Sequence, residues 1–326
     1  MLLAEAGADT SFASFDVPIW GWGALLATIA AMLSVDLFLH REHHEPTPRR
    51  ALRESLIWIT IGVAFAGVIA IAFGGQAFGE YLSGYVIEKS LSIDNVFVWA
   101  VIFASFAIPD RYQHRVLFWG IFGALTLRAV FIALGSALLA AVWWTLLVFG
   151  AVLIYTGIKV LRHREDEGEV SHERAVALLG RFIPVTDRLD GHHFFTRIDG
   201  KRFATPLLAA LVVVEVSDVI FAVDSVPAVL AVSREPFIVF ASNAFAILGL
   251  RALYFLLAGM KARFHYLSHA LGGILIFVGM KMMVSHWWHM PTYVSLIFIF
   301  SVLIGAVVAS ERKTRLLARL PDEPDG

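Results

Sequence analysis

The sequence predicts an all-α protein that crosses a membrane several times. Of its 326 residues, 58% are hydrophobic and only 16% are charged, whereas soluble domains carry about 25% charged residues. The mean hydropathy is +0.74. The apolar residues are gathered in long runs, and a helix of roughly 20 residues is long enough to cross the hydrocarbon layer. Together these observations favour a polytopic helical membrane protein.

The apolar runs predict about nine transmembrane helices. Inside a bilayer a continuous apolar run satisfies its own backbone hydrogen bonds only as a helix. A membrane β-barrel would instead show alternating segments of about ten residues. In chain order the runs are 19–39, 53–73, 81–107, 114–137, 140–161, 205–232, 236–258, 264–285 and 290–309.

The placement of Lys and Arg predicts the orientation. The segment before the first run carries Glu5, Asp9 and Asp16 but no Lys or Arg, which is unlike a cleavable signal. The next connection contains four arginines between Arg41 and Arg53, and basic residues then gather in every second connection. Because short cytoplasmic loops collect Lys and Arg, we expect the N-terminus outside and the C-terminus inside.

One long loop, at about 162–203, interrupts the series of apolar runs. It contains a candidate amphipathic helix at 171–182 and, further on, Asp199-Gly200 between two β-prone runs. An Asp-Gly pair in that setting predicts a β-hairpin. The loop is too short for a separate catalytic domain.

Two stretches of the sequence align without gaps and reveal an internal repeat. Glu88-Lys-Ser-Leu-Ser-Ile-Asp94-Asn95 matches Asp218-Val-Ile-Phe-Ala-Val-Asp224-Ser225, Leu125-Thr-Leu-Arg128 matches Leu248-Gly-Leu-Arg251, and Gly157-Ile-Lys159 matches Gly279-Met-Lys281. The unit is three helices (helices 3–5 and 6–8). Because three is odd, the second copy enters the membrane from the opposite side, as in many secondary transporters. The predicted regions are 1–80 with helices 1 and 2, the first repeat at 81–161, the cytoplasmic loop at 162–204, the inverted second repeat at 205–285, and helix 9 with its tail at 286–326.

Acidic residues deep in the predicted helices indicate ion binding. A charge near the bilayer centre costs about 2.5–3.5 kcal/mol in insertion measurements, so it is a functional candidate by default. The acids outnumber the deep arginines by three, and an unpaired carboxylate at low dielectric must take up a proton or bind a cation. The alternative is a structural charge network. The deep acids are Glu88, Asp94, Glu215, Asp218 and Asp224, and the deep arginines are Arg128 and Arg251.

The ligand types available in this region are hard oxygens, which favour Mg²⁺, Ca²⁺ or Mn²⁺ over copper or zinc. Glu88, Ser92 and Asn95 share one helix face, whereas Asp94 reaches the same site only if the helix is locally unwound or the site lies between faces. In the second copy Pro227 is expected to free the carbonyl of Val223 beside Asp224. We expect Arg128 and Arg251 to pair with carboxylates or compete with the cation, and Lys159 and Lys281 to extend toward the membrane faces. Further oxygen groups that line a possible ion path are Asp36, Ser92, Ser225 and Asn243.

The same segments resemble the signature motifs of the TerC family. The similar runs are Glu88-Lys-Ser-Leu-Ser-Ile-Asp94-Asn95-Val-Phe-Val, Glu215-Val-Ser-Asp218-Val-Ile-Phe-Ala-Val-Asp224-Ser-Val-Pro-Ala, and Ser242-Asn243 with the following residues through Arg251. The similarity covers nearly the whole chain and is greatest to the Alx branch. It implies an inner-membrane transporter of bacterial type, related to the LysE superfamily, with Mn²⁺ as its cargo and export as its direction. By position it implies that Glu88, Asp94, Asn95, Glu215, Asp218 and Asp224 are the metal ligands.

We therefore expect a secondary transporter, not an enzyme, that exports a divalent metal cation by alternating access and exchanges it for protons. We expect no cofactor. We also expect no nucleic-acid partner, because the net charge of −1 offers no basic surface for nucleic acid. The sequence leaves the oligomeric state open. The absence of cysteine excludes thiolate metal sites. Two alternatives stay open: a membrane scaffold at the translocation machinery or in tellurite and metal stress resistance, and, more remotely, an intramembrane aspartyl protease.

Overall fold

The structure, a computed structural model, describes residues 12–39, 48–142, 144–162, 184–186, 188–198, 200–257, 266–284 and 292–317. These residues are helical apart from short connections and one hairpin, so the predicted helical class is confirmed. The elements are α1 (Ile19–Leu39), α2 (Pro48–Ser105), α3 (Asp110–Ala141), α4 (Thr145–Arg162), β1 (Phe195–Ile198), β2 (Lys201–Ala204), α6 (Pro206–Leu230), α7 (Pro236–Ile247), α8 (Leu250–Leu257), α9 (Leu267–Val284) and α10 (Thr292–Leu317).

Five helical stretches in the described part are long and apolar enough to cross a membrane. They are Ile19–Phe38, Arg49–Ser92, Asp110–Leu139, Pro206–Leu230 and Pro236–Leu256. The apolar runs of the sequence fall on the helices listed above. The number of membrane crossings stays a prediction.

Helix α2 reverses direction at Gly74, whose backbone adopts φ 89° and ψ 178°. The Tyr81 hydroxyl donates a 3.0 Å hydrogen bond to the carbonyl of Gly62, and the rings of Phe65 and Tyr81 pack 5.6 Å apart. In a straight helix nineteen residues would separate these groups by about 28 Å. The two halves of α2 therefore lie antiparallel, with the turn at a glycine that tolerates a positive φ.

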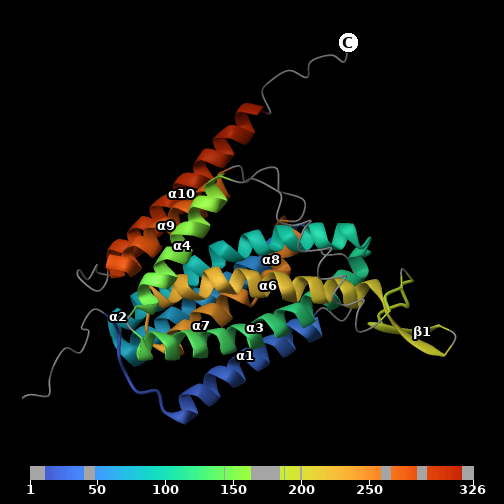
Figure 1. Cartoon of the computed structure of the whole chain (residues 1–326), viewed down its shortest axis with the longest axis horizontal. Helices are drawn as coiled ribbons and strands as arrows, with labels where there is room; N and C mark the ends of the chain where they lie inside the picture. Colours follow the sequence, from blue (N-terminus) through green and yellow to red (C-terminus); the bar gives the residue numbers. More distant parts are fainter. Residues whose placement is uncertain are drawn as a thin grey trace, which may run out of the picture.

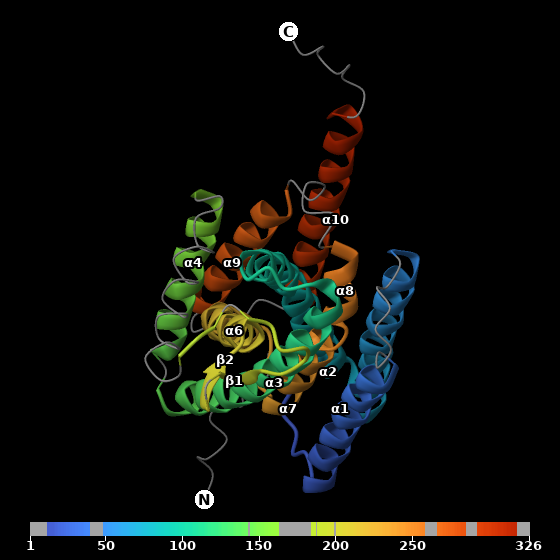
Figure 2. The same ribbon diagram turned by 90° about the vertical axis from the view of Figure 1, so that its right-hand side faces the viewer.

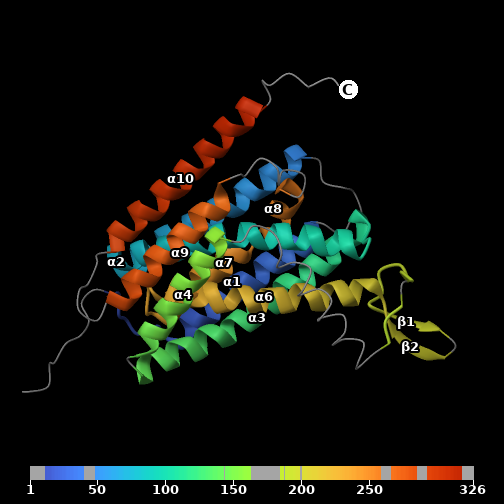
Figure 3. The same ribbon diagram turned by 45° about the horizontal axis from the view of Figure 1, so that its top comes forward.

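The helices form two groups that cross. Helices α3 and α6 lie side by side, while α4, α9 and α10 are inclined across them (Figures 1 and 3). The view along α6 shows α4 and α9 adjacent on one flank and α1 on the other (Figure 2). Buried apolar side chains from α1, α2, α3, α7 and α8 form one core, to which aromatic stacking such as Phe65 on Phe245, with centroids 4.2 Å apart, contributes.

Helices α4 and α9 approach so closely that their backbones touch. A Cβ atom on Gly157 would lie 2.7 Å from the carbonyl oxygen of Gly272, and one on Gly279 would lie 2.7 Å from that of Gly150. Small residues that allow such contact are the usual basis of helix association in membranes. We call these four glycines the glycine seam.

Helix α6 and the α7–α8 segment differ in continuity within the described part of the second half of the chain. Helix α6 continues through Pro227, so the chain is not unwound beside Asp224, although Pro227 has no N–H to donate to the carbonyl of Val223. A break separates α7 from α8, where Leu248 has φ −58° and ψ 132° and Gly249 has φ 83°. The side chain of Trp58 fills the space where a Cβ on Gly249 would be, so a glycine is required there for two reasons.

The predicted hairpin in the long loop is confirmed. Strands β1 and β2 pair antiparallel, with Arg197 opposite Arg202 and Ile198 opposite Lys201. The turn places Gly200 at φ 77°, as an Asp-Gly hairpin requires. The predicted helix at 171–182 lies outside the described residues.

Candidate functional site

A buried ion cluster joins the two sequence repeats. The guanidinium of Arg128 on α3 forms an ion pair with Glu88 on α2. It also contacts both carboxylate oxygens of Asp218 on α6, at 3.3 Å and 3.5 Å. The exposed fractions of Glu88, Arg128 and Asp218 are 0%, 1% and 3%. Buried charges need such partners, because desolvation of a lone ion costs several kcal/mol. Two acids that align in the repeat thus share one arginine.

Neutral polar side chains surround this cluster. Asn243 on α7 donates a 3.1 Å hydrogen bond to Glu88, the Ser92 hydroxyl lies 3.5 Å from the same carboxylate, and Arg128 donates to the Ser225 hydroxyl at 3.2 Å. Asn95 is also buried, as the predicted face shared with Glu88 and Ser92 requires. The Oδ1 atom of Asn243 is buried and has no hydrogen-bond partner among the described residues. An orphaned oxygen of this kind beside carboxylates is a suitable cation ligand.

Glu215 lies one turn before Asp218 on α6, and its Oε2 atom is buried without a hydrogen-bond partner among the described residues. It packs against α3 at Gly123, where an added Cβ would overlap the carboxylate. The absence of a side chain at Gly123 therefore makes the room that Glu215 occupies. Glu215 is one of the acidic residues that outnumber the deep arginines, and its role as a metal ligand stays a prediction.

The remaining predicted residues lie elsewhere or cannot be placed. Asp224 accepts a 2.8 Å hydrogen bond from Thr156 on α4. The backbone of Asp94 lies in α2, but its side chain is outside the described residues. Arg251 binds Asp36 on α1 at 2.6 Å. The two arginines that align in the repeat therefore have different partners, because the break before α8 carries Arg251 away from the cluster.

The described side chains do not form a ready-made metal site. No three of the His, Asp or Glu residues that the structure describes are grouped as they would be around a metal ion. The guanidinium of Arg128 occupies the place between Glu88 and Asp218. A metal that bound both carboxylates would have to displace it.

Lys89 has a role that sequence reasoning missed. Its Nζ atom donates to the carbonyl oxygens of Ala246 and Leu248, at 3.0 Å and 3.4 Å. These carbonyls end α7, and the break at Gly249 removes their normal partners in the next turn. A cation at a helix C-terminus also suits the helix dipole. The signal in the sequence was Gly249 itself, at the position where the first repeat has Thr126.

Glu80 was missed as well, because it adjoins a predicted external turn. Its side chain is fully buried, and it accepts hydrogen bonds from Ser233 at 2.7 Å, Gln76 at 3.2 Å and the backbone N–H of Ala13 at 2.5 Å. Lys281 is 6% exposed, and its Nζ atom is buried without a hydrogen-bond partner in the described part of the chain. The expectation that Lys281 extends to a membrane face is therefore wrong.

The segment before α1, residues 12–18, covers this end of the bundle. Phe15 stacks on Phe73 with centroids 4.0 Å apart, and Arg234 lies over the ring of Phe12 at 4.8 Å. Glu235, in the turn between α6 and α7, accepts backbone N–H groups from Phe237 and Phe15. Burial raises the pKa of Glu235 above its ordinary value, and these hydrogen bonds oppose the rise only in part.

Comparisons with known proteins agree with this membrane architecture. Residues 73–316 match the model described as "Integral membrane protein TerC family". An uncharacterized membrane protein of Myxococcus xanthus is 46% identical over 90% of this chain and 92% of its own. A protein of Escherichia coli K12 that carries the name "Putative membrane-bound redox modulator Alx" is 44% identical over 87% of this chain and 91% of its own. No solved structure matches.

Proposed function

The chain belongs to the TerC family of integral membrane proteins, and on that premise we propose that it is a secondary transporter that exports a divalent metal cation from the cytoplasm. Mn²⁺ is the first candidate for the cargo, and uptake of protons is the proposed counter-movement. The proposed location is the bacterial inner membrane. The protein is proposed to act without a cofactor and without enzymatic chemistry.

One observation carries this proposal: Glu88 and Asp218, which align in the two repeats, meet at a single guanidinium. The positive charge of Arg128 holds both carboxylates close together. A divalent cation offers the same acids a stronger partner, because carboxylate oxygens are preferred ligands of hard cations. Arg128 then acts as a tethered competitor that returns to the acids once the metal has left.

The proposed ligands follow from the cluster and from the family resemblance. Glu88 and Asp218 form the centre, and Asn95 and Glu215 lie on the same two helices. Asp94 and Asp224, one and a half turns further along these helices, complete the proposed set. The ion path includes the oxygen groups of Ser92, Ser225, Asn243 and Asp36.

The proposed architecture is nine membrane-spanning helices that contain two inverted three-helix repeats, with the N-terminus outside and the C-terminus inside. The glycine seam supports the inversion. The spacing that aligns Gly157 with Gly279 also aligns Gly150 with Gly272, and the contacts run crosswise, Gly150 to Gly279 and Gly157 to Gly272. Reciprocal contacts of this kind are what a two-fold axis between two copies produces.

Closure at both ends of the cluster supports alternating access. Helices α1 and α7 begin together, where Trp22 meets Phe237 with ring centroids 5.2 Å apart. The hydrogen bonds of Glu80 tie α2 to the turn before α7 at this end. At the opposite end the ion pair of Asp36 with Arg251 joins α1 to α8. In an occluded state, which lies between the inward-open and outward-open forms, contacts between helices close both ends of the transport path.

Metal flux into proteoliposomes tests the proposal. We expect Mn²⁺ transport by the wild type, and loss of at least tenfold in Glu88→Gln and in Asp218→Asn, because each removes one charge from the centre. Asp190→Asn is the matched control, since Asp190 is an exposed carboxylate in the long loop. Parallel assays with Mg²⁺ and Ca²⁺ define the cargo. The transporter assignment fails if no divalent cation moves.

The rival is a membrane scaffold at the translocation machinery, or a protein of tellurite or metal stress resistance, with no transport of its own. It predicts that Glu88→Gln and Asp218→Asn retain full function in cells, because both are nearly isosteric. The name redox modulator belongs to the relatives. This chain has no cysteine, so its own side chains cannot carry out thiol–disulfide exchange.

A further inference from the structure

The β1–β2 hairpin presents a basic face that the transport proposal does not use. The hairpin projects beyond the ends of the helices, next to the start of α6 (Figure 1). Opposite residues of an antiparallel pair point to the same face, as do residues two apart in one strand. Phe195, Arg197, Arg202 and Ala204 therefore share one face, and Thr196, Ile198, Lys201 and Phe203 share the other.

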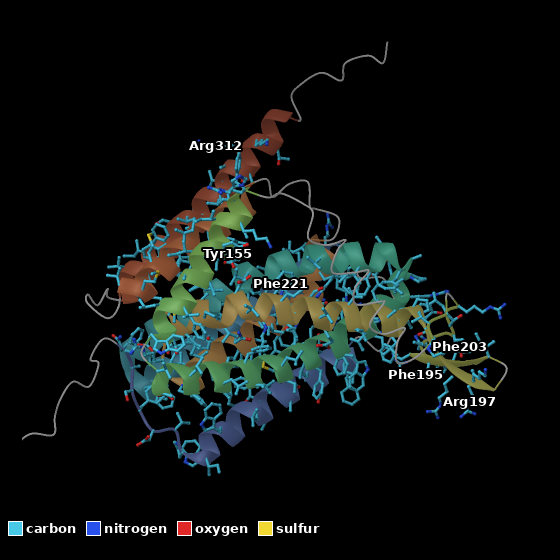
Figure 4. All side chains as sticks on the ribbon, viewed as in Figure 1. Tyr155, Phe195, Arg197, Phe203, Phe221 and Arg312 are labelled. Carbon is cyan, nitrogen blue, oxygen red and sulfur yellow. The ribbon has the colours of Figure 1, made fainter. Side chains whose placement is uncertain are left out.

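The two faces differ in exposure. Phe195, Arg197 and Arg202 are exposed, with Phe195 at 48%, and only Ala204, next to α6, is buried on their face; on the other face Thr196, Ile198 and Phe203 are half-buried and Lys201, beside the turn, is exposed. Figure 4 shows Arg197 pointing away from the helices. The hairpin thus turns one side to the protein and offers the surroundings a side made of one aromatic ring and two guanidinium groups.

Arg197 and Arg202 lie directly opposite each other. Like charges in this position destabilise a strand pair, and no described acid is hydrogen-bonded to either. The nearby Asp190 accepts a 2.9 Å hydrogen bond from Thr196 on the other face. An anion placed between the two guanidinium groups would remove the repulsion, and phosphate is the anion whose geometry the planar arginine fork matches.

The membrane is the nearest source of such an anion. Arg202 is four residues from Pro206, where the apolar span of α6 begins, so its Cα lies within about 13 Å of that point along even a fully extended chain. Lys and Arg clusters immediately beside a span attract anionic lipids, and each residue contributes a gain in affinity of about fivefold. Phe195 adds an aromatic side chain of the kind that settles at the level of the headgroups.

We propose that the exposed hairpin face of Phe195, Arg197 and Arg202 binds the headgroup of an anionic phospholipid, in the leaflet on the side where α6 begins. The two arginines hold the phosphate, and the Phe195 ring enters the headgroup layer. This site is separate from the Arg128 cluster and does not depend on the transport proposal.

Hydrogen exchange of the full chain in lipid nanodiscs tests the site. In nanodiscs that mix phosphatidylglycerol with phosphatidylcholine, we expect amides of 195–204 to exchange several-fold more slowly than in phosphatidylcholine alone. The variant with Arg197→Gln and Arg202→Gln should lose this difference. Lys201→Gln removes one charge from the opposite face of the same hairpin and should retain it. Equal exchange of variant and wild type in phosphatidylcholine shows that the hairpin still folds.

Three outcomes would overturn the assignment. Exchange that is independent of lipid charge would show that the face binds no anionic lipid. An equal loss in Lys201→Gln would mean that only total charge matters. Slowing to the same extent by inorganic phosphate in phosphatidylcholine nanodiscs would make the face a site for free phosphate instead.

Discussion

The ammonium group of Lys89 donates a 3.0 Å hydrogen bond to the carbonyl oxygen of Ala246, at the end where α7 breaks. We expect Lys89→Met to lower the free energy of unfolding by about 1.5–3 kcal/mol, the usual range for a hydrogen bond to a charged group. Unfolding in mixed micelles measures the change. Lys201→Met, at an exposed hairpin position, is the control and should have little effect. A neutral result at Lys89 would mean that water replaces the ammonium group at these carbonyls.

Removal of Arg128 tests the central cluster. Arg128→Gln leaves Glu88 and Asp218 buried without a positive partner, and the loss of one member of a buried ion pair costs about 3–5 kcal/mol. We expect a strong fall in melting temperature. Adding Glu88→Gln and Asp218→Asn to this variant should restore most of the loss, because the uncompensated charges are then gone. Arg312→Gln, at an exposed position on α10, is the control and should leave the melting temperature unchanged.

Arg128→Gln also tests whether Arg128 and the metal compete for the same two carboxylates. If Arg128 competes with the metal, Mn²⁺ should raise the melting temperature of Arg128→Gln more than that of the wild type, since binding to the folded state stabilises it by mass action. An identical shift in both proteins would show that Arg128 and the metal do not share the carboxylates.

The glycine seam predicts opposite effects at adjacent positions of α9. A Cβ on Gly272 would lie 2.9 Å from the carbonyl oxygen of Gly157, whereas one on Gly273 would meet nothing within 4 Å. We expect Gly272→Ala to destabilise the protein by about 1–3 kcal/mol through overpacking. Gly273→Ala should be neutral or stabilise by up to about 1 kcal/mol, since Ala is the better helix former. Equal effects in an unfolding assay would mean that α4 and α9 do not touch at this point.

Glu235 predicts a dependence of stability on pH. Its pKa is raised in the folded state, so the folded protein holds this proton more tightly than the unfolded chain. The stability that this group contributes is therefore present below the ordinary pKa of Glu and is lost as the pH rises through the raised value. We expect Glu235→Gln to melt at a higher temperature than the wild type at neutral pH, with the difference vanishing in acid. A lower melting temperature for Glu235→Gln than for the wild type at neutral pH would contradict this prediction.

The sequence alone predicted the helical membrane class, the hairpin at Asp199-Gly200 and the family. Each of these depends on a local pattern: continuous apolar runs, a turn dipeptide and contiguous motifs. It also singled out Glu88, Asp218 and Arg128, because charges in an apolar run stand out whatever the fold. The repeat aligned Gly157 with Gly279, but the sequence did not predict that α4 and α9 touch at their glycines, since a small residue does not indicate which helix it will contact.

Tertiary structure decided the partners. Arg128 and Arg251 align in the repeat, yet one binds Glu88 and Asp218 and the other binds Asp36, because the break at Gly249 displaces α8 while α3 stays continuous. The burial of Glu80 likewise depends on Ala13 and Ser233, which are distant from it in the chain. Composition and periodicity determine which residues must leave water. Only the packing of remote helices determines which charge compensates which, since an ion pair requires an approach within a few ångströms that no local pattern encodes.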